Sequence, residues 1–170
     1  MQRIMIIGGP GSGKSTLARA LGARLGLPVV HIDPMFWEPG WVQRDVGQTR
    51  AMIAAAAAKK VWIFEGNSSA NYAGRAARAD LIVFLDLPRP LRLWRIAKRL
   101  MMYRGRTRPE MPANCPERLD LGFLAEVWTW DRRTRSKAIA LLAEKGGQGT
   151  TLRLTSPRQV RRFLADPGIW

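Results

Sequence analysis

The segment from Gly8 to Thr16, Gly-Gly-Pro-Gly-Ser-Gly-Lys-Ser-Thr, restricts what this chain can fold into more than any other segment. It matches the pattern G-x-x-x-x-G-K-[ST], whose fixed positions are filled by Gly8, Gly13, Lys14 and Ser15. An apolar, β-branched run at 3–7 precedes the segment, and a run with helical spacing at 17–21 follows it. A strand, a glycine-rich loop and a helix in this order are the context in which the pattern binds phosphate.

The residue types of this phosphate loop explain the expected chemistry. Glycine allows positive φ angles that bring backbone N–H groups close to phosphate oxygens, and the following helix adds partial positive charge at its N-terminus. Lys14 is expected to reach the β- and γ-phosphates as a catalytic residue, and the Ser15 hydroxyl to ligate Mg²⁺. We therefore expect ATP and Mg²⁺ as cofactors. The expected nucleotide-binding residues are Gly8, Gly9, Pro10, Gly11, Ser12, Gly13, Lys14, Ser15 and Thr16.

Strand and helix patterns alternate along the 170 residues. Strands are predicted at 3–7, 28–32, 61–64, 81–85 and 150–155. Helices are predicted at 43–60, within 68–79, at 89–103, at 117–145 with an interruption, and at 157–164, and the stretch 35–41 is predicted as a loop. This order predicts an α/β fold with a doubly wound, five-stranded parallel sheet, formed by one domain that covers residues 1–170.

The composition points to anionic partners. Lysine and arginine total 28 against 13 aspartates and glutamates, which gives a net charge of +15. Phosphate groups suit arginine, and nucleic acid is also possible at this charge, although a chain rich in alanine and arginine can also reflect a compositional bias. No apolar run approaches the ~18 residues of a membrane span, so no membrane partner is expected. Cys115 is the only cysteine, which excludes an internal disulfide, and we expect a cytoplasmic protein.

Ligands in such a sheet bind at the carboxyl ends of the strands. The polar residues at these positions are Asp33, Glu65, Asn67, Asp86, Thr155 and Ser156. Asp33 and Glu65 are best placed to join Ser15 around Mg²⁺, and Asp33 is also expected to accept a proton from an acceptor hydroxyl. The alternative for each carboxylate is a helix cap or a turn, and Asp86 is more typical of that alternative.

The phosphate loop and the segment 79–88, which ends in Asp86-Leu87-Pro88, resemble adenylate kinases and related nucleoside monophosphate kinases. The resemblance implies that Arg95 packs on adenine and that Arg99 grips phosphate. It also implies a short arginine-rich lid at about 104–117, a catalytic Arg132 on the helix that returns from it, and an adenine-side loop at Ser156-Pro157. The alternative for these arginines is a solvated basic helix face.

The acceptor side departs from adenylate kinases. Their Asp-Gly-Phe-Pro-Arg segment is replaced by Glu65-Gly66-Asn67-Ser68-Ser69, and His31-x-Asp33 is followed by Trp37-x-x-Gly40-Trp41. Over nearly the whole chain, this pattern is similar to a smaller group of P-loop proteins named for DNA topology modulation. That resemblance implies phosphotransferase-like motifs on the ATP side and leaves the acceptor open.

Two functions are therefore expected to compete. The first is a kinase that moves the γ-phosphate of ATP to a nucleotide or to a small metabolite, whose hydroxyl would lie near Asp33 beneath Trp37 or Trp41. The alternative is a nucleic-acid-associated P-loop ATPase. The chain shows no helix-turn-helix, no zinc-finger spacing and no exposed aromatic-basic platform, which favours the kinase and makes any nucleic-acid binding non-specific.

Overall fold

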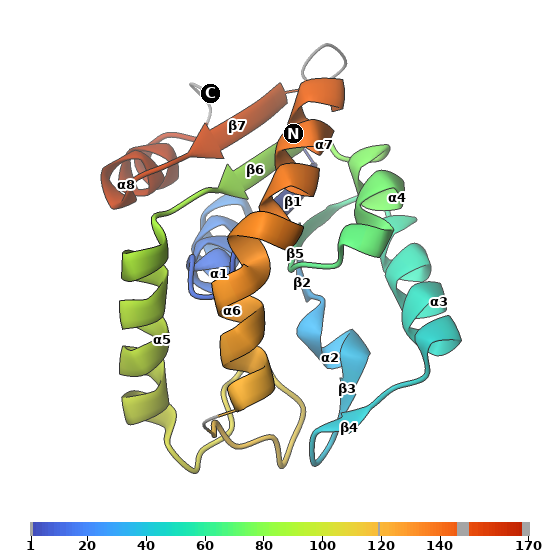
Figure 1. The fold of residues 1–170 in the computed structure, drawn as a ribbon. Coiled ribbons are helices and arrows are strands. Elements are labelled where there is room, and N and C mark those ends of the chain that lie inside the picture. The colour runs from blue at the N-terminus through green and yellow to red at the C-terminus, as the bar shows by residue number, and fades with distance from the viewer. Residues whose placement is uncertain (1, 119, 146–149, 168–170) are drawn as a thin grey trace.

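A five-stranded, all-parallel sheet forms the centre of the computed structural model, which describes residues 2–118, 120–145 and 150–167 (Figure 1). The strands lie in the order β2-β5-β1-β6-β7. Their bounds are Val29–His31 for β2, Trp62–Glu65 for β5, Arg3–Gly8 for β1, Leu81–Leu85 for β6 and Thr150–Leu154 for β7. The strand β1 therefore lies in the middle of the sheet, and the phosphate loop leaves from its carboxyl end.

Helices cover both faces of the sheet. Side chains alternate along β1, so that Ile4 and Ile6 pack in one apolar cluster while Met5 and Ile7 pack in the other. The first cluster is covered by α1 (Lys14–Leu25) and α8 (Pro157–Ala165). The second is covered by α3 (Val46–Ala57), α4 (Tyr72–Ala76) and α7 (Arg135–Lys145). The central strands are buried on both faces, which explains their continuous apolar sequences.

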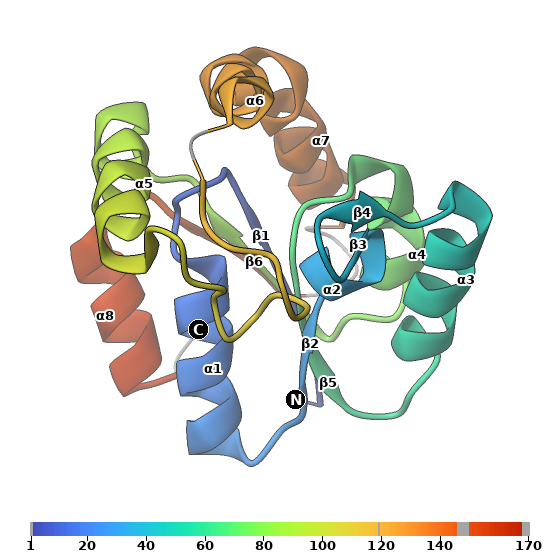
Figure 2. The same ribbon diagram turned by 90° about the horizontal axis from the view of Figure 1, so that it is seen from below.

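The remaining elements lie beyond the carboxyl edge of the sheet, where they surround the phosphate loop (Figure 2). They comprise α5 (Arg89–Tyr103), α6 (Leu121–Arg133), α2 (Asp33–Phe36), the 3₁₀ turn η1 (Ser69–Asn71) and an antiparallel hairpin of β3 (Trp37–Glu38) and β4 (Val42–Gln43). The lid segment 104–117 crosses between α5 and this hairpin. Among the helices of the described residues, none combines the length and the apolar character needed to cross a membrane.

The predicted parallel sheet is confirmed, and so is the helix at 89–103. The prediction of a loop at 35–41 is wrong, because that stretch contains the end of α2 and most of the β3–β4 hairpin. The hairpin turns through positive φ angles at Gly40 and Trp41. A tryptophan rarely adopts a positive φ angle, so the sequence does not indicate this turn. The predicted helix at 43–60 begins only at Val46, where Asp45 accepts a hydrogen bond from the backbone N–H of Gln48.

The helix predicted at 117–145 is two helices. Asp120 caps the start of α6 at Leu121, and α6 ends at Arg133, with Thr134 as its cap, before α7 begins at Arg135. The interruption in the prediction is thus confirmed, but Glu117, Arg118 and Asp120 of the predicted helix lie outside α6.

Gly66 gives a direct test of the packing at the end of β5. Its φ angle is +131°, and a Cβ atom there would lie 1.9 Å from Ile32 Cγ2. We expect Gly66→Ala to lower the free energy of unfolding by about 2 kcal/mol or more, through overpacking and backbone strain. Gly74→Ala is the matched control, because a Cβ there meets nothing within 4 Å and lies in α4; it should raise stability by ~0.5–1 kcal/mol. Urea unfolding of both variants checks this, and equal stability of the two would contradict the packing.

Candidate functional site

The phosphate loop is built to accept an anion. Gly13, at φ 92°, precedes the first turn of α1, and no side chain caps that turn. The first backbone N–H groups of a helix have no acceptor within the helix, so those at the start of α1 are free to bind a ligand. Lys14 Nζ lies 3.2 Å from the Gly9 carbonyl oxygen, to which it donates across the loop. Burial lowers the pKa of Lys14, which is the expected cost of holding an ammonium group ready in a closed site.

Glu65 is a buried carboxylate held in its charged form. Its Oε1 lies 2.6 Å from His31 Nδ1, and it also accepts a hydrogen bond from Ser15. Burial alone would raise the pKa of Glu65, but these hydrogen bonds and the nearby Lys14 charge hold it below its usual value. Glu65 is therefore tied both to β2 through His31 and to the phosphate loop through Ser15.

The pKa of Asp33 is shifted in the opposite direction from that of Glu65. It lies in the first turn of α2, and burial raises its pKa, with the negative charge of Glu65 adding to the effect. The charges of Lys14, Arg108 and Arg99 only partly offset this. Two neighbouring carboxyl groups thus have environments that push their pKa values apart, an arrangement that separates a proton acceptor from a permanently charged group.

Ser15, Asp33 and Glu65 carry the oxygen donors that Mg²⁺ prefers, and their role as metal ligands stays a prediction. The electrostatic and hydrogen-bond couplings above place the two carboxylates and the hydroxyl at one end of the loop. Within the described residues, no group of three or more His, Cys, Asp or Glu side chains could hold a metal by itself. Mg²⁺ is commonly held by one or two carboxylates together with phosphate oxygens, and this sparse set suits that mode of binding.

Two of the arginines that the sequence singled out lie at this site. Arg95 Nη1 donates to the carbonyl oxygen of Ser12 at 2.9 Å, which places Arg95 against the phosphate loop. Arg99 Nε lies 3.3 Å from Glu117 Oε2, and Arg108 of the lid forms an ion pair with the same carboxylate. Glu117 is buried, so the two guanidinium groups are held together close enough to Asp33 to affect its pKa.

The lid is docked onto the hairpin. Trp41 donates from Nε1 to the Pro116 carbonyl at 3.0 Å and from its backbone N–H to Cys115 Sγ at 3.3 Å. Gly40 N–H donates to the Ala113 carbonyl, and Arg19 of α1 pairs with Glu110 of the lid at 2.7 Å. Trp41 therefore fastens the lid, and the expected place of an acceptor beneath Trp37 or Trp41 stays a prediction.

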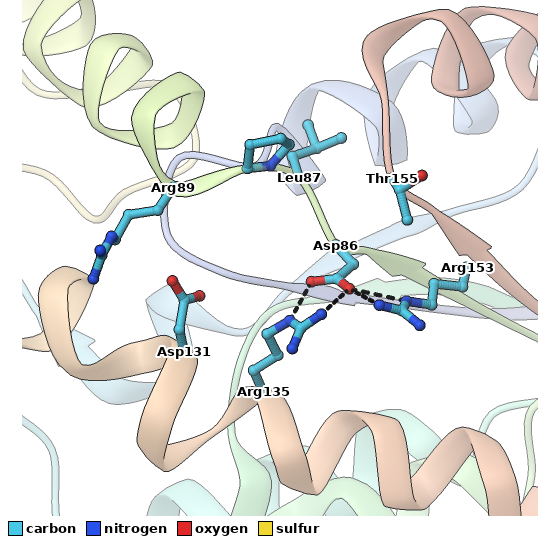
Figure 3. Close-up of a pocket in the computed structure, with 8 residues that line it drawn as sticks. Asp86, Leu87, Arg89, Asp131, Arg135, Arg153 and Thr155 are labelled. Atoms are coloured by element: carbon cyan, nitrogen blue, oxygen red, sulfur yellow. Dashed lines mark hydrogen bonds and ion pairs between the residues drawn. The ribbon is translucent and has the colours of Figure 1, made fainter.

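Other predicted site residues are placed elsewhere. Arg132 is exposed on α6, where it follows Asp131, and its catalytic role stays a prediction. The Ser156 side chain caps α8 in a capping box with Gln159, and Pro157 is the first residue of that helix. Asp86 accepts hydrogen bonds from both Arg135 and Arg153 (Figure 3). Asp86 thus links the end of β6 to β7 and to the start of α7.

Sequence reasoning missed Arg92, which packs directly beneath the phosphate loop. Its Nε donates to the Leu87 carbonyl at 3.1 Å, and its Nη2 donates to Asp131 Oδ1 at 2.5 Å. A Cβ atom at Gly9 would lie 2.4 Å from Arg92 Nη1, so only glycine fits there. Its position three residues before Arg95 on one helix was the available signal, but helical spacing alone does not show which way a side chain faces.

Glu126 of α6 was also missed. Burial raises its pKa, and the charges of Lys14 and Asp33 act on it. The helix that returns from the lid therefore contributes an acidic side chain to the electrostatics of the site, where the resemblance implied only arginines.

Comparisons with known proteins place the chain in a family. Residues 4–111, more than half of the chain, match the model of the AAA domain family AAA_18, and the chain belongs to that family. Shikimate kinase from Nitratidesulfovibrio vulgaris (strain Hildenborough) is 36% identical over 102 residues, which cover 51% of this chain and 58% of that protein. The match thus spans little more than half the length of this relative.

Solved structures show the same fold. A shikimate kinase from Acinetobacter baumannii in complex with shikimate superposes with a TM-score of 0.63 at 15% identity, over 98% of this chain and 90% of that one. A deoxyadenosine kinase from M. mycoides with bound dCTP superposes with a TM-score of 0.58 at 16% identity, over 99% and 100% of the two chains. The chain has a P-loop kinase-like fold.

The opposite pKa shifts of the two carboxyl groups predict opposite effects on stability. The raised pKa of Asp33 means that stability falls as pH rises from the unfolded pKa through the folded one, so Asp33→Asn should raise Tm at pH 7. The lowered pKa of Glu65 stabilises the fold above its unfolded pKa, and this gain is lost as pH falls through the folded value, so Glu65→Gln should lower Tm at pH 7. Each kcal/mol corresponds to about 2–4 °C in a chain of this size. Calorimetric melting of the two variants checks the signs, and a lower Tm for Asp33→Asn would contradict the buried state of that carboxyl.

Proposed function

We propose that this chain is an ATP-dependent phosphotransferase that moves the γ-phosphate of ATP to the hydroxyl of a small acceptor. The observation that carries the proposal is the convergence of Lys14, Asp33 and Glu65 at the phosphate loop, with pKa values displaced in the directions described above. Membership of the AAA_18 family and the shikimate kinase relative support the same class of reaction.

Each residue has a distinct role in this proposal. Lys14 and the backbone N–H groups at the start of α1 bind and orient the phosphates, and Arg99 adds positive charge where the transferred group gains negative charge. Ser15 and Glu65 hold the metal ion, with Asp33 beside them. Asp33 takes the proton of the acceptor hydroxyl, and its raised pKa makes it a stronger base than an ordinary aspartate. Bound Mg²⁺·ATP supplies the phosphoryl group and neutralises its charge.

The contacts on the acceptor side favour a hydroxyl-bearing metabolite over a nucleotide. A nucleotide acceptor needs a cationic clamp for its phosphate, and Arg44, Arg75 and Arg78 are the cations expected nearest to the acceptor from the sequence. Arg44 pairs with Glu38 at 2.9 Å. The buried Arg75 donates to the Gly66 carbonyl and lies over the Phe64 ring. Of the three, the exposed Arg78 remains to bind an acceptor phosphate. A neutral or singly charged acceptor therefore fits this side better than a nucleotide.

The test is phosphoryl transfer from ATP to a panel of hydroxy acids, sugars, nucleosides and nucleotides. Lys14→Ala should slow turnover by about 10²–10³ through loss of one preorganised charge, while Lys60→Ala, at an exposed lysine, serves as the charge-matched control with unchanged rate.

Asp33→Asn should keep ATP affinity, measured by calorimetry, but lower the rate of phosphoryl transfer by about 10² or more. Undiminished transfer by Asp33→Asn would return Asp33 to a structural role in α2. A wild-type chain that transfers phosphate to no acceptor would refute the kinase.

The net charge of +15 favours a second candidate, the nucleic-acid-associated ATPase that the resemblance to the DNA topology modulation group implies. For a kinase, DNA affinity should be non-specific, independent of ATP, and lost steeply with salt, by about 10³ or more between 50 and 200 mM, because it depends on counterion release. Fluorescence anisotropy with labelled duplex DNA across a salt series measures this. Tight, ATP-dependent DNA binding at ~150 mM salt would instead favour the ATPase.

A further inference from the structure

A cavity of about 410 Å³ lies at the carboxyl ends of β6 and β7, beside the junction of α6 and α7 (Figure 3). It is lined by Asp86, Leu87, Pro88, Arg89, Asp131, Arg135, Arg153 and Thr155. Asp86 follows Ile82 and Phe84 on the face of β6 that packs against α7, whereas α1 covers the opposite face. The volume falls within the range of small-molecule binding sites.

The cavity is distinct from the phosphate loop. The guanidinium group of Arg92 stands between them, donating to Asp131 of the cavity wall while its Nη1 packs against Gly9. The Trp130 ring lies on the same guanidinium group, with its centroid 4.9 Å from Arg92 Cζ. Lys14 and the start of α1 therefore do not contribute to the cavity lining.

The lining carries more positive charge than its carboxylates balance. Asp86 alone accepts hydrogen bonds from Arg135 at 2.7 and 2.9 Å and from Arg153 at 2.9 and 2.5 Å. Asp131 already forms an ion pair with Arg92, which does not line the cavity, so the negative charge of Asp131 is balanced by that arginine. The Arg89 guanidinium lies 4.4 Å from the Trp128 ring centroid and adds a further cation.

Donor groups remain available on these arginines. Each guanidinium has five N–H groups, and Arg135 and Arg153 use only Nε and Nη2 in their bonds to Asp86. Their side chains are 36% and 45% exposed, so a ligand can reach the Nη1 groups that the bonds to Asp86 leave unused. The first turn of α5 also begins at this cavity, with Pro88 in the cap position, no side-chain cap and no acidic residue.

We propose that this cavity is a second anion-binding site, which takes a small ligand bearing a phosphate or pyrophosphate group. Paired guanidinium groups match the oxygens of such a group in a bidentate manner, and Leu87 and Pro88 add apolar surface beside it. The Asp86 carboxylate holds Arg135 and Arg153 in fixed positions before the ligand binds, which lowers the entropic cost of binding. This site stands independently of the proposed kinase activity.

Calorimetry with inorganic pyrophosphate at about 150 mM salt tests the site in the full chain. The chain carries Lys14→Ala, so that pyrophosphate binding at the phosphate loop is weakened. We expect this protein to bind pyrophosphate, and the additional change Arg89→Gln or Arg153→Gln to weaken binding about tenfold or more. Arg50→Gln is the charge-matched control on the distant helix α3 and should change affinity less than twofold. Arg89 does not bond to Asp86, so Arg89→Gln decides the outcome if Arg153→Gln fails to fold.

The same titrations with ATP distinguish the source of the phosphate. Tighter binding of ATP than of pyrophosphate, lost in Arg89→Gln, indicates a nucleotide ligand, and equal binding indicates an inorganic or simple organic phosphate. Equal weakening by Arg89→Gln and Arg50→Gln would show only diffuse attraction to a basic surface and would overturn the proposal. Absence of pyrophosphate binding at millimolar concentration would overturn it as well.

Discussion

The phosphate loop depends on the buried guanidinium group that packs beneath it. Arg92 is almost completely buried, and it contacts the exit of β6 through the Leu87 carbonyl, α6 through Asp131 and Trp130, and the loop itself through Gly9. Burying this charge is costly, and the cost is offset only because its hydrogen bonds and the aromatic ring are all in place. The loop, the helix that carries Arg95 and Arg99, and the helix that returns from the lid are therefore held in one fixed arrangement.

The acceptor side depends on a different set of contacts. Trp41 of the hairpin is hydrogen bonded to the lid residues Cys115 and Pro116, so the hairpin that follows Asp33 is joined to the lid that carries Arg108. The burial that acts on the pKa values of Lys14, Asp33 and Glu65 also lowers the local dielectric, which strengthens the interactions among the three groups. Glu117 pairs with both Arg99 and Arg108, and its single negative charge balances only one of these two guanidinium groups.

The large net charge is only partly a property of the surface. Arg75 and Arg92 are buried, and Arg135 and Arg153 share the single carboxylate of Asp86. These arginines organise loops and helix ends through hydrogen bonds to carbonyl and carboxylate oxygens, which suits a planar group with five donors. The total charge therefore overstates the surface available to nucleic acid, and its local distribution is what favours a phosphate-handling protein.

The sequence by itself determined the phosphate loop and the helix at 89–103, because each of these depends on residues close together in the chain, and the order of strand and helix patterns determined the parallel sheet. A glycine pattern between a strand and a helix is a local signal, and five apolar runs separated by helices leave few alternative topologies. The sequence also placed Asp33 and Glu65 at the right edge of the sheet, since parallel strands end on the same side. It did not determine what those carboxylates contact. His31 and Glu65 lie 34 positions apart, Arg92 and Asp131 lie 39 apart, and Trp41 and Pro116 lie 75 apart. Such pairs form only when separate elements pack together, and burial then moves the pKa values in ways that no local pattern encodes. The tertiary structure alone decided that Trp41 fastens the lid, that Asp86 joins two arginines, and that Asp33 and Glu65 differ in their affinity for a proton.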